Sequence, residues 1–350
     1  MNILILTGRF GLGHVKAAEA IRETILAENP ACRVNIVDFA EYWCPAAADL
    51  VYDSFTFLTS QCSGLYNRLN HGADRLGKVP CTRLFLRKIH HLLTAFHPDA
   101  IIVTMPFLGQ YVSACLTEFR FRIPLYTCIT DVTFHRGWIA SACTHYFVAS
   151  QATRLALLSC GIPSFKITVS GVPVRQSFRQ RPISHPRSSL TFRILVMGGG
   201  LGILPASGPV LKSLAALPDT EVTVICGRNR KLAARLRREY PSFTIIGYTN
   251  QVADHMGKAH LLLTKAGGVT LFEAIAVRTP LLVFPPFLEQ EKENARFIQD
   301  TGIGRILEEG AEEEILRELC SSRQTLQTMA SNMARLEDGW SSISRVLVSG

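Results

Sequence analysis

A chain of 350 residues is longer than one compact core usually holds, so its length predicts two domains of ordinary size. Hydrophobic residues make up 47% of the chain and charged residues 19%, proportions that support well-buried cores. No uninterrupted apolar stretch approaches the roughly 18 residues that a membrane-spanning helix needs, so we expect no segment to cross a membrane.

The net charge of +9 is unevenly placed along the chain. Residues 1–180 hold 17 Lys and Arg against 11 Asp and Glu, whereas residues 181–350 hold 20 against 17. A basic surface of this kind can meet nucleic acid, anionic lipid or an acidic substrate. The sequence contains no recognisable nucleic-acid module, so we expect small anionic ligands or lipid as partners and no nucleic acid.

The cysteines and the first residues bear on the compartment. The ten cysteines form no C-x-x-C pair and no Cys/His spacing typical of a zinc site, which predicts scattered reduced thiols, as in the cytosol, rather than a disulfide framework. The start, MNILILTGRF, has a four-residue apolar run before a glycine turn and no basic leader. It therefore predicts a first strand rather than a signal peptide.

The first elements in chain order predict a βαβ unit. Residues 2–6 form a short apolar run typical of a strand, and the glycine turn 8–14 follows it. A helical stretch over 15–28 and a second strand over 33–39 complete the unit, which predicts a parallel sheet with right-handed crossovers.

This opening also permits a dinucleotide-binding interpretation. Gly11 and Gly13 have the spacing of that fingerprint, and Asp38 ends the second strand. The interpretation is weak because Lys16 occupies the third glycine position and His14 follows the turn directly.

Residues 40–97 predict two or three helical pieces, of which the last is basic and amphipathic. In residues 81–96, CTRLFLRKIHHLLTAF, three Lys or Arg and two His residues are interleaved with an apolar set: Leu84, Leu86, Ile89, Leu92, Leu93 and Phe96. Such a helix can rest on an anionic membrane surface, or it can be an ordinary packed helix with a solvated basic face. The sequence leaves both interpretations open.

Strand and helix patterns alternate through the rest of the chain and restart after a polar, prolyl and basic linker over 179–191. We predict a first Rossmann-like domain over 1–178, a second over 192–335 and a C-terminal helix over 336–350 that includes Trp340. The second domain opens with a strand and the turn Gly198 to Gly202. Further strands are predicted over 99–105, 125–131, 145–150, 166–170, 193–197, 221–226, 243–247, 259–264 and 280–284. The fold class is therefore α/β, with two doubly wound domains whose ligand sites face an interdomain cleft.

The stretch 264–295 is the most informative about a ligand. Gly267 and Gly268 follow a buried strand and open a helix, whose free N–H groups and positive dipole end suit a phosphate. Glu273 in that helix can accept hydrogen bonds from a ribose diol. The next helix opens with groups suited to sugar hydroxyls: Gln290, Glu291 and Asn294. Together these residues predict a nucleotide-sugar pocket.

In order and spacing, the motifs resemble a known family, the GT-B glycosyltransferases of the monogalactosyldiacylglycerol synthase and processive diacylglycerol glucosyltransferase group, which are related to MurG. One departure is Glu289, where the family usually has glycine, and it bears on the choice of donor sugar. The motifs that carry the resemblance are G-x-G-H at 11–14, T-D-x-x-x-H-x-x-W at 130–138, V-x-G-x-P-V at 169–174, the glycine turn 198–202, C-G-R-N at 226–229, T-K-x-G-G at 264–268 and Q-E-x-x-N at 290–294.

The resemblance implies an inverting transfer of a hexose from a UDP-sugar to a lipid hydroxyl, most simply diacylglycerol. It implies a base on the acceptor side, for which His14 is the first candidate and Asp131 the rival. His135 and Trp138 are expected on the acceptor or sugar side, with a plain structural role for Trp138 as the alternative. The resemblance places on the donor side Gly13, Gly199, Gly200, Gly202, Arg228, Asn229, Gly267, Gly268, Val269, Thr270, Glu273, Gln290, Glu291 and Asn294.

No cofactor is expected, since the UDP-sugar is a substrate and no D-x-D metal motif appears in a matching context. The expected location is the cytoplasm, at the inner face of the plasma membrane, with the first domain meeting anionic lipid. The alternatives are an isoprenoid-linked or other hydrophobic acceptor, a non-catalytic protein that senses UDP-sugars, and a NAD-dependent enzyme.

Overall fold

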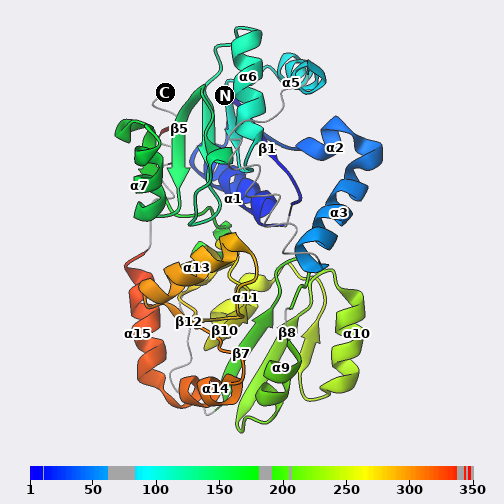
Figure 1. The fold of residues 1–350 in the computed structure, drawn as a ribbon, viewed down its shortest axis with the longest axis vertical. Helices are drawn as coiled ribbons and strands as arrows, with labels where there is room; N and C mark the ends of the chain where they lie inside the picture. Colours follow the sequence, from blue (N-terminus) through cyan, green and yellow to red (C-terminus); the bar gives the residue numbers. More distant parts are fainter. Residues whose placement is uncertain are drawn as a thin grey trace. The chain divides into compact units, whose positions relative to one another are not determined.

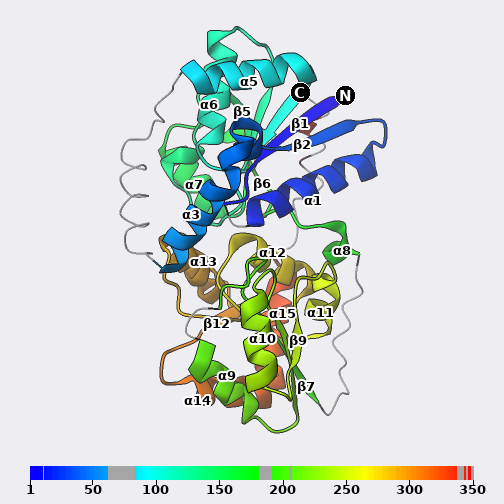
Figure 2. The same ribbon diagram turned by 90° about the vertical axis from the view of Figure 1, so that its right-hand side faces the viewer.

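In the computed structural model of this protein, residues 1–10, 12–61, 83–180, 191–204, 207–336, 343 and 346–347 are described, without the side chains of 55–61 and 207. By its internal contacts the chain divides into two compact units, Met1–Gln176 with Asp338–Gly350, and Ser177–Glu337. Most of the predicted linker 179–191 lies outside the described residues, and Gly11 and Trp340 lie wholly outside them. Figures 1 and 2 show the ribbon in two views.

The first unit is built on a six-stranded parallel sheet with the order β2-β1-β3-β4-β5-β6. Its strands are β1 (Asn2–Thr7), β2 (Arg33–Asp38), β3 (Ala100–Val103), β4 (Leu125–Cys128), β5 (Cys143–Val148) and β6 (Ile167–Val169). Its helices are α1 (Gly13–Glu28), α2 (Phe39–Trp43), η1 (Pro45–Ala47), α3 (Ala48–Gln61), α5 (Arg83–Phe96), α6 (Leu108–Glu118), η2 (Arg136–Trp138), α7 (Gln151–Ser159) and η3 (Ser164–Lys166).

Both faces of this sheet are covered, as the unbroken apolar strands require. Leu4 and Leu6 of β1 join the core under α5 and α6, which pack side by side (Figure 1). Ile3 and Ile5 alternate with them and are equally buried, so the opposite face of β1 is also covered.

The second unit repeats the plan with the sheet order β12-β11-β10-β7-β8-β9, again all parallel. Its strands are β7 (Phe192–Met197), β8 (Thr220–Ile225), β9 (Thr244–Ile246), β10 (Leu261–Thr264), β11 (Leu281–Val283) and β12 (Gly304–Ile306). The remaining helices are α8 (Gln176–Arg179), α9 (Ser207–Ala215), α10 (Arg230–Glu239), α11 (Val252–Lys258), α12 (Gly268–Val277), α13 (Glu289–Asp300), α14 (Glu312–Ser321) and α15 (Arg323–Ala334). The predicted fold of two doubly wound α/β domains is confirmed.

Two features differ from the sequence-based expectation. Strand β12 was not predicted, because three residues with only Ile306 as a large apolar side chain carry no strand signal of their own; pairing with β11 creates the strand. The break between α14 and α15 was not predicted either; it falls at Ser322, whose side chain accepts a hydrogen bond from the Thr325 N–H and so caps α15.

Candidate active site

Each sheet has one point where the chain reverses its direction of winding, and ligands of such sheets bind beyond the carboxyl ends of the strands at that point. In the first sheet the point lies between β1 and β3, and in the second between β7 and β10. The turn before His14 leaves β1, whereas the turn 198–202 leaves β7 and the stretch 265–268 leaves β10. The predicted motifs therefore lie at both reversal points.

In the first unit, His14 stands in the first turn of α1 and is held at two places. Its ring Nδ1 lies 2.8 Å from Thr130 Oγ1, just beyond the end of β4. Its backbone carbonyl accepts a hydrogen bond of 3.2 Å from Thr104 Oγ1, just beyond the end of β3. The ring also meets Trp138 edge to face, with 6.3 Å between the ring centroids.

Burial lowers the pKa of His14 from its ordinary value, and the negative charge of Asp131 partly opposes this effect. A hydrogen bond with the Thr104 backbone also raises the pKa of His14, as the charge of Asp131 does. Because burial is the largest of these causes, His14 is neutral near pH 7 and its ring can accept a proton. The structure thus brings the two candidate bases, His14 and Asp131, within electrostatic reach of each other.

The two aromatic residues expected on the acceptor or sugar side are tied into the fold. Trp138 is only 3% exposed and belongs to the core of the first unit, so its packing role is the one that the structure favours. His135 Nδ1 accepts a hydrogen bond from the Gly137 N–H at 3.2 Å and caps η2. Its ring contacts Phe107 and Trp138, with centroids 5.6 and 6.0 Å apart.

In the second unit, the turn after β7 packs backbone to backbone against the turn after β8. Gly202 has a φ of +68°, and a Cβ there would lie 1.9 Å from the Cys226 carbonyl oxygen. Asn229 holds the two turns together, because its Nδ2 donates to the Gly202 carbonyl at 3.2 Å and its Oδ1 accepts from the Leu232 N–H at 2.9 Å. Both ends of this amide serve the fold, which assigns Asn229 a structural role. Arg228 is exposed and lies over the Tyr248 ring, with 5.7 Å from Cζ to the centroid.

The predicted phosphate turn leads directly into α12, and Gly267 is its N-cap without any side-chain cap. Among the described residues, a Cβ at Gly267 would meet no atom within 4 Å other than its neighbours in the chain, so the space beside these N–H groups is open in that part of the structure. Thr264, the last residue of β10, is 2% exposed, and its Oγ1 has no hydrogen-bond partner among the described residues. A buried hydroxyl of this kind needs a ligand or a water molecule as partner. Glu273 is 5% exposed, in the same helix.

The residues of α13 point to a charged pair that the sequence did not predict. Glu291 is buried, and its Oε1 forms an ion pair of 3.0 Å with Lys265 Nζ. The lysine stem runs past Gly199, since a Cβ on that glycine would lie 3.7 Å from Lys265 Cε. In the sequence, Lys265 directly follows the strand at the reversal point, and this position is the signal that could have identified the charged pair. Asn294 is fully buried and donates to the Ala266 carbonyl at 2.9 Å, so it braces the turn before α12.

Two other residues of α13 were singled out in the sequence, Gln290 as a donor-binding residue and Glu289 as a departure from the family pattern. Gln290 is partly buried at the start of the helix. Glu289 pairs with Lys292 one turn later at 2.7 Å and is a surface residue that stabilises the first turn of the helix.

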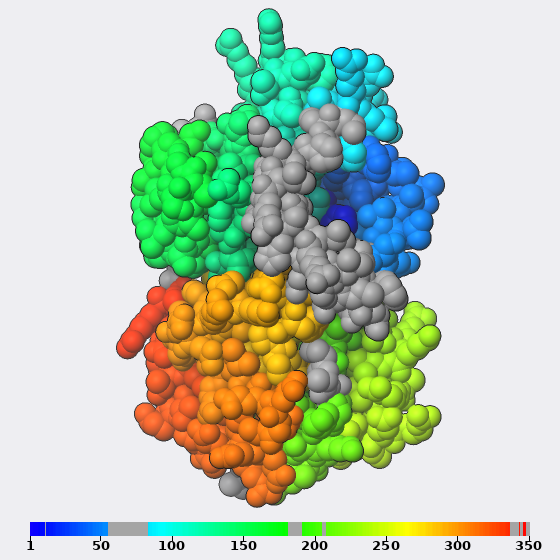
Figure 3. Space-filling model, in the orientation of Figure 1, coloured from blue at the N-terminus to red at the C-terminus, as the bar shows by residue number. Residues whose placement is uncertain are grey.

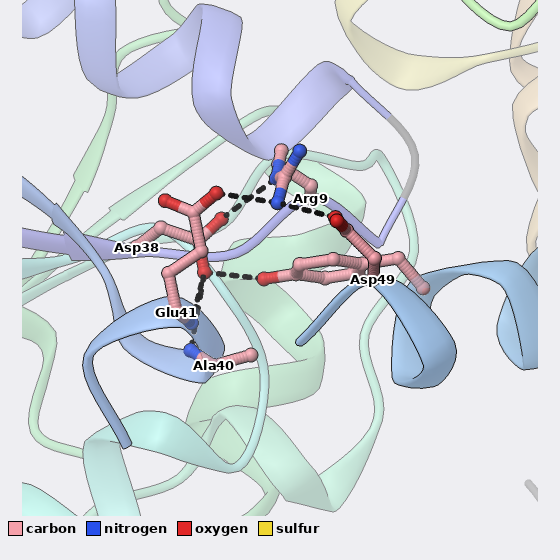
Figure 4. A network of polar contacts seen from close by, with 6 residues as sticks. Arg9, Asp38, Ala40, Glu41 and Asp49 are labelled. Atoms are coloured by element: carbon pink, nitrogen blue, oxygen red, sulfur yellow. Dashed lines mark hydrogen bonds and ion pairs between the residues drawn. The ribbon is translucent and has the colours of Figure 1, made fainter. Parts of the chain in front are cut away.

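Asp38, on which the dinucleotide interpretation rests, is committed to a polar network (Figure 4). Its Oδ1 accepts from the N–H groups of Ala40 and Glu41 and from the Tyr52 hydroxyl, and its Oδ2 lies 3.4 Å from Arg9 Nε. A carboxylate engaged in this way does not serve a ribose 2′-hydroxyl, which disfavours the dinucleotide interpretation.

Comparison with known proteins identifies the family. Residues 14–174 match the model of monogalactosyldiacylglycerol synthase, and residues 193–342 match the model of the glycosyltransferase family 28 C-terminal domain. The chain is a glycosyltransferase whose second unit carries a family 28 C-terminal domain. The predicted recognition and enzyme class are confirmed.

Several relatives align with this glycosyltransferase over nearly its whole length. It is 29% identical to the processive diacylglycerol beta-glucosyltransferase of Staphylococcus carnosus, with 96% of this chain and 89% of the relative covered. It is 28% identical to the protein of the same name from Staphylococcus epidermidis, with 97% and 90% covered.

Solved structures support the GT-B fold of the glycosyltransferase. Acinetobacter baumannii MurG is 15% identical, with a TM-score of 0.68 and coverage of 100% of this chain and 99% of that one. The UDP-GlcNAc 2-epimerase of Neisseria meningitidis is 16% identical, with a TM-score of 0.60 and coverage of 100% and 99%. Since this fold also serves an epimerase, the fold alone does not decide the reaction.

Among the described helices, none is long and apolar enough to cross a membrane. Within the same part of the chain, no group of three or more His, Cys, Asp or Glu side chains is placed to hold a metal ion.

Proposed function

We propose that this glycosyltransferase moves a hexose from a UDP-sugar to the hydroxyl of diacylglycerol at a membrane surface. The observation that carries the proposal is that both family motifs sit at the reversal points of their sheets, with His14 at one and the α12 turn at the other. The names of the aligned relatives supply the acceptor class.

We assign the donor to the second unit. The uncapped N–H groups of α12 and the open space beside Gly267 suit a diphosphate, and the Lys265–Glu291 ion pair lies at the same edge. Glu273 would bind the ribose, and Gln290 with Glu291 the sugar hydroxyls.

We assign the base to His14. In the transfer, the acceptor O–H bond breaks and its proton passes to the imidazole, while the acceptor oxygen forms a bond to the anomeric carbon. The bond from that carbon to the phosphate oxygen breaks, and UDP leaves with the electron pair. The neutral, oriented ring of His14 suits this task. Asp131 would then stabilise the imidazolium that forms, or act as the base itself if His14 proves dispensable.

The first unit supplies the membrane-facing surface in this proposal. The apolar residues Ile89, Leu92 and Leu93 of α5 are buried in the core, whereas Arg87 and Lys88 are exposed. Figure 3 shows the cyan atoms of α5 at the surface. The helix therefore packs as an ordinary surface helix and would meet anionic lipid through its basic face rather than by inserting an apolar one.

The test is incubation of the protein with a panel of UDP-sugars and diacylglycerol in vesicles, followed by mass analysis of the lipid. We expect a hexosyl-diacylglycerol, formed faster on vesicles with an anionic lipid than on neutral ones. His14→Ala should reduce turnover by at least about 100-fold and leave UDP binding intact. If the product were a glycosylated isoprenoid, the isoprenoid would replace diacylglycerol as the assigned acceptor. UDP-sugar binding without any transfer would indicate a sensor.

His145→Ala is the matched control for this variant. His145 is another partly buried histidine, and its Nε2 lies 2.8 Å from Thr168 Oγ1, but it stands on β5 away from the reversal point. Its loss should leave turnover within about threefold of wild type. Full activity of His14→Ala would move the base assignment to Asp131.

A further inference from the structure

Three buried threonines line the carboxyl ends of three neighbouring strands in the first unit. Thr7 ends β1, Thr104 follows β3 and Thr130 lies two residues beyond β4, and they are 1%, 0% and 2% exposed. Thr104 Oγ1 lies 2.9 Å from Thr7 Oγ1. Hydroxyl groups buried at this depth normally have a specific hydrogen-bond partner.

Two of these hydroxyls hold the same residue. Thr104 Oγ1 donates to the His14 carbonyl at 3.2 Å and fixes the backbone, and Thr130 Oγ1 lies 2.8 Å from Nδ1 and fixes the ring. Trp138 packs edge to face against the His14 ring and so restricts its position. His14 is therefore pre-oriented on the sheet edge: Nδ1 faces the Thr130 hydroxyl, and the ring also forms a hydrogen bond with the Thr104 backbone.

A histidine base has to keep its lone pair on the nitrogen that faces the substrate, and its tautomer is set by the partner of the other nitrogen. A carboxylate in that position orients the ring but also raises the pKa of the imidazole by its charge. A threonine hydroxyl orients the ring without adding charge, which fits a histidine whose pKa burial has lowered.

We propose that Thr130 is the positioning residue of His14: its Oγ1 accepts the Nδ1–H, which fixes the tautomer with the lone pair on Nε2. The inference rests on the proposed function in one respect, namely that His14 is the base. The contact itself and the tautomer that it selects belong to the folded protein without substrate.

The first test measures the tautomer directly. In protein labelled with 15N-histidine, the His14 signals are assigned by their loss in His14→Gln, and their shifts report which nitrogen carries the proton. We expect the Nδ1–H form in the wild-type protein. An Nε2–H form would overturn the proposal, whatever the enzyme transfers and to which acceptor.

The second test uses Thr130→Val, which keeps the shape of the side chain and removes the hydroxyl, and Thr130→Ser, which restores it. We expect kcat to fall roughly 10- to 100-fold in the valine variant, with the KM for the UDP-sugar within about twofold, and the serine variant to recover most of the loss. The acid limb of the kcat/KM profile should lie below pH 6.5 in the wild-type protein and move lower still in the valine variant, because an acceptor of Nδ1–H also stabilises the protonated ring.

Thr168→Val is the matched control, since it removes the hydroxyl from the other His–Thr pair described above. It should leave kcat and the His14 signals unchanged. An equal fall of kcat in Thr130→Val and Thr168→Val would show that Thr130 has only a structural role. If His14→Ala were fully active while the Nδ1–H form was still observed, the base assignment would fail and the positioning contact would stand.

Discussion

At the scale of single residues, Arg9 pairs with three carboxylates of the first unit. It lies in the turn between β1 and α1 and forms ion pairs with Asp38, Glu41 and Asp49 (Figure 4). Its Cζ lies 4.8 Å from the centroid of the Tyr52 ring. These partners come from the end of β2 and from α2 and α3. One guanidinium therefore ties the turn that leads to His14 to three other elements.

Arg9→Gln should lower the free energy of unfolding by about 1–3 kcal/mol, because it leaves three carboxylates without their cation. The comparison is Arg296→Gln, whose pair with Glu293 is exposed and should contribute less than about 0.5 kcal/mol. Urea denaturation of both variants measures the difference. Equal midpoints would show that the Arg9 network has no more effect than a surface pair.

At the scale of elements, the turn after β7 is shaped by its close contact with the turn after β8. Gly202 and Gly227 both have positive φ, and a Cβ on either would lie within 2.5 Å of a backbone carbonyl oxygen. Glycine is required at these two positions by backbone packing, whether or not a ligand is bound.

Gly202→Ala should destabilise the second unit by about 2–5 kcal/mol, since strain at positive φ adds to an overlap with the Cys226 carbonyl. Gly208→Ala is the control, because a Cβ there meets no atom of the described, non-neighbouring residues within 4 Å and the residue lies in α9, where alanine is the better helix former. It should change stability by no more than about 1 kcal/mol, in the stabilising direction. Thermal unfolding distinguishes the two, and equal melting temperatures would refute the packing argument.

At the scale of the whole molecule, the chain returns at its end to the unit in which it began. Residues Asp338–Gly350 group with the first unit, and Ile343 and Leu347 are 1% and 5% exposed. Ile343→Ala should therefore cost about 2–5 kcal/mol and act on the first unit.

Hydrogen exchange can locate this effect, with reduced protection expected in β1 to β6 more than in β7 to β12. Leu326→Ala, in the core of the second unit, should give the reverse pattern. If Ile343→Ala loosened the second unit instead, the assignment of the C-terminal residues to the first unit would be wrong.

The sequence by itself determined the architecture, because the information is local. Apolar runs such as 261–264 predict buried strands, glycine turns mark where they end, and alternation with helices leads to parallel sheets. The order of the motifs was enough to identify the family, and the same locality let the sequence predict His14 and the α12 turn as site elements.

Only the tertiary structure decided which side chains are free for chemistry. Asn229 and Trp138 belong to motifs, yet the Asn229 amide forms two hydrogen bonds with the backbone and Trp138 is buried in the core. Thr130 and Lys265 gained their importance from partners 116 and 26 residues away. Such pairings form when parallel strands bring their carboxyl ends together, and no local pattern in the sequence records which side chains will meet there.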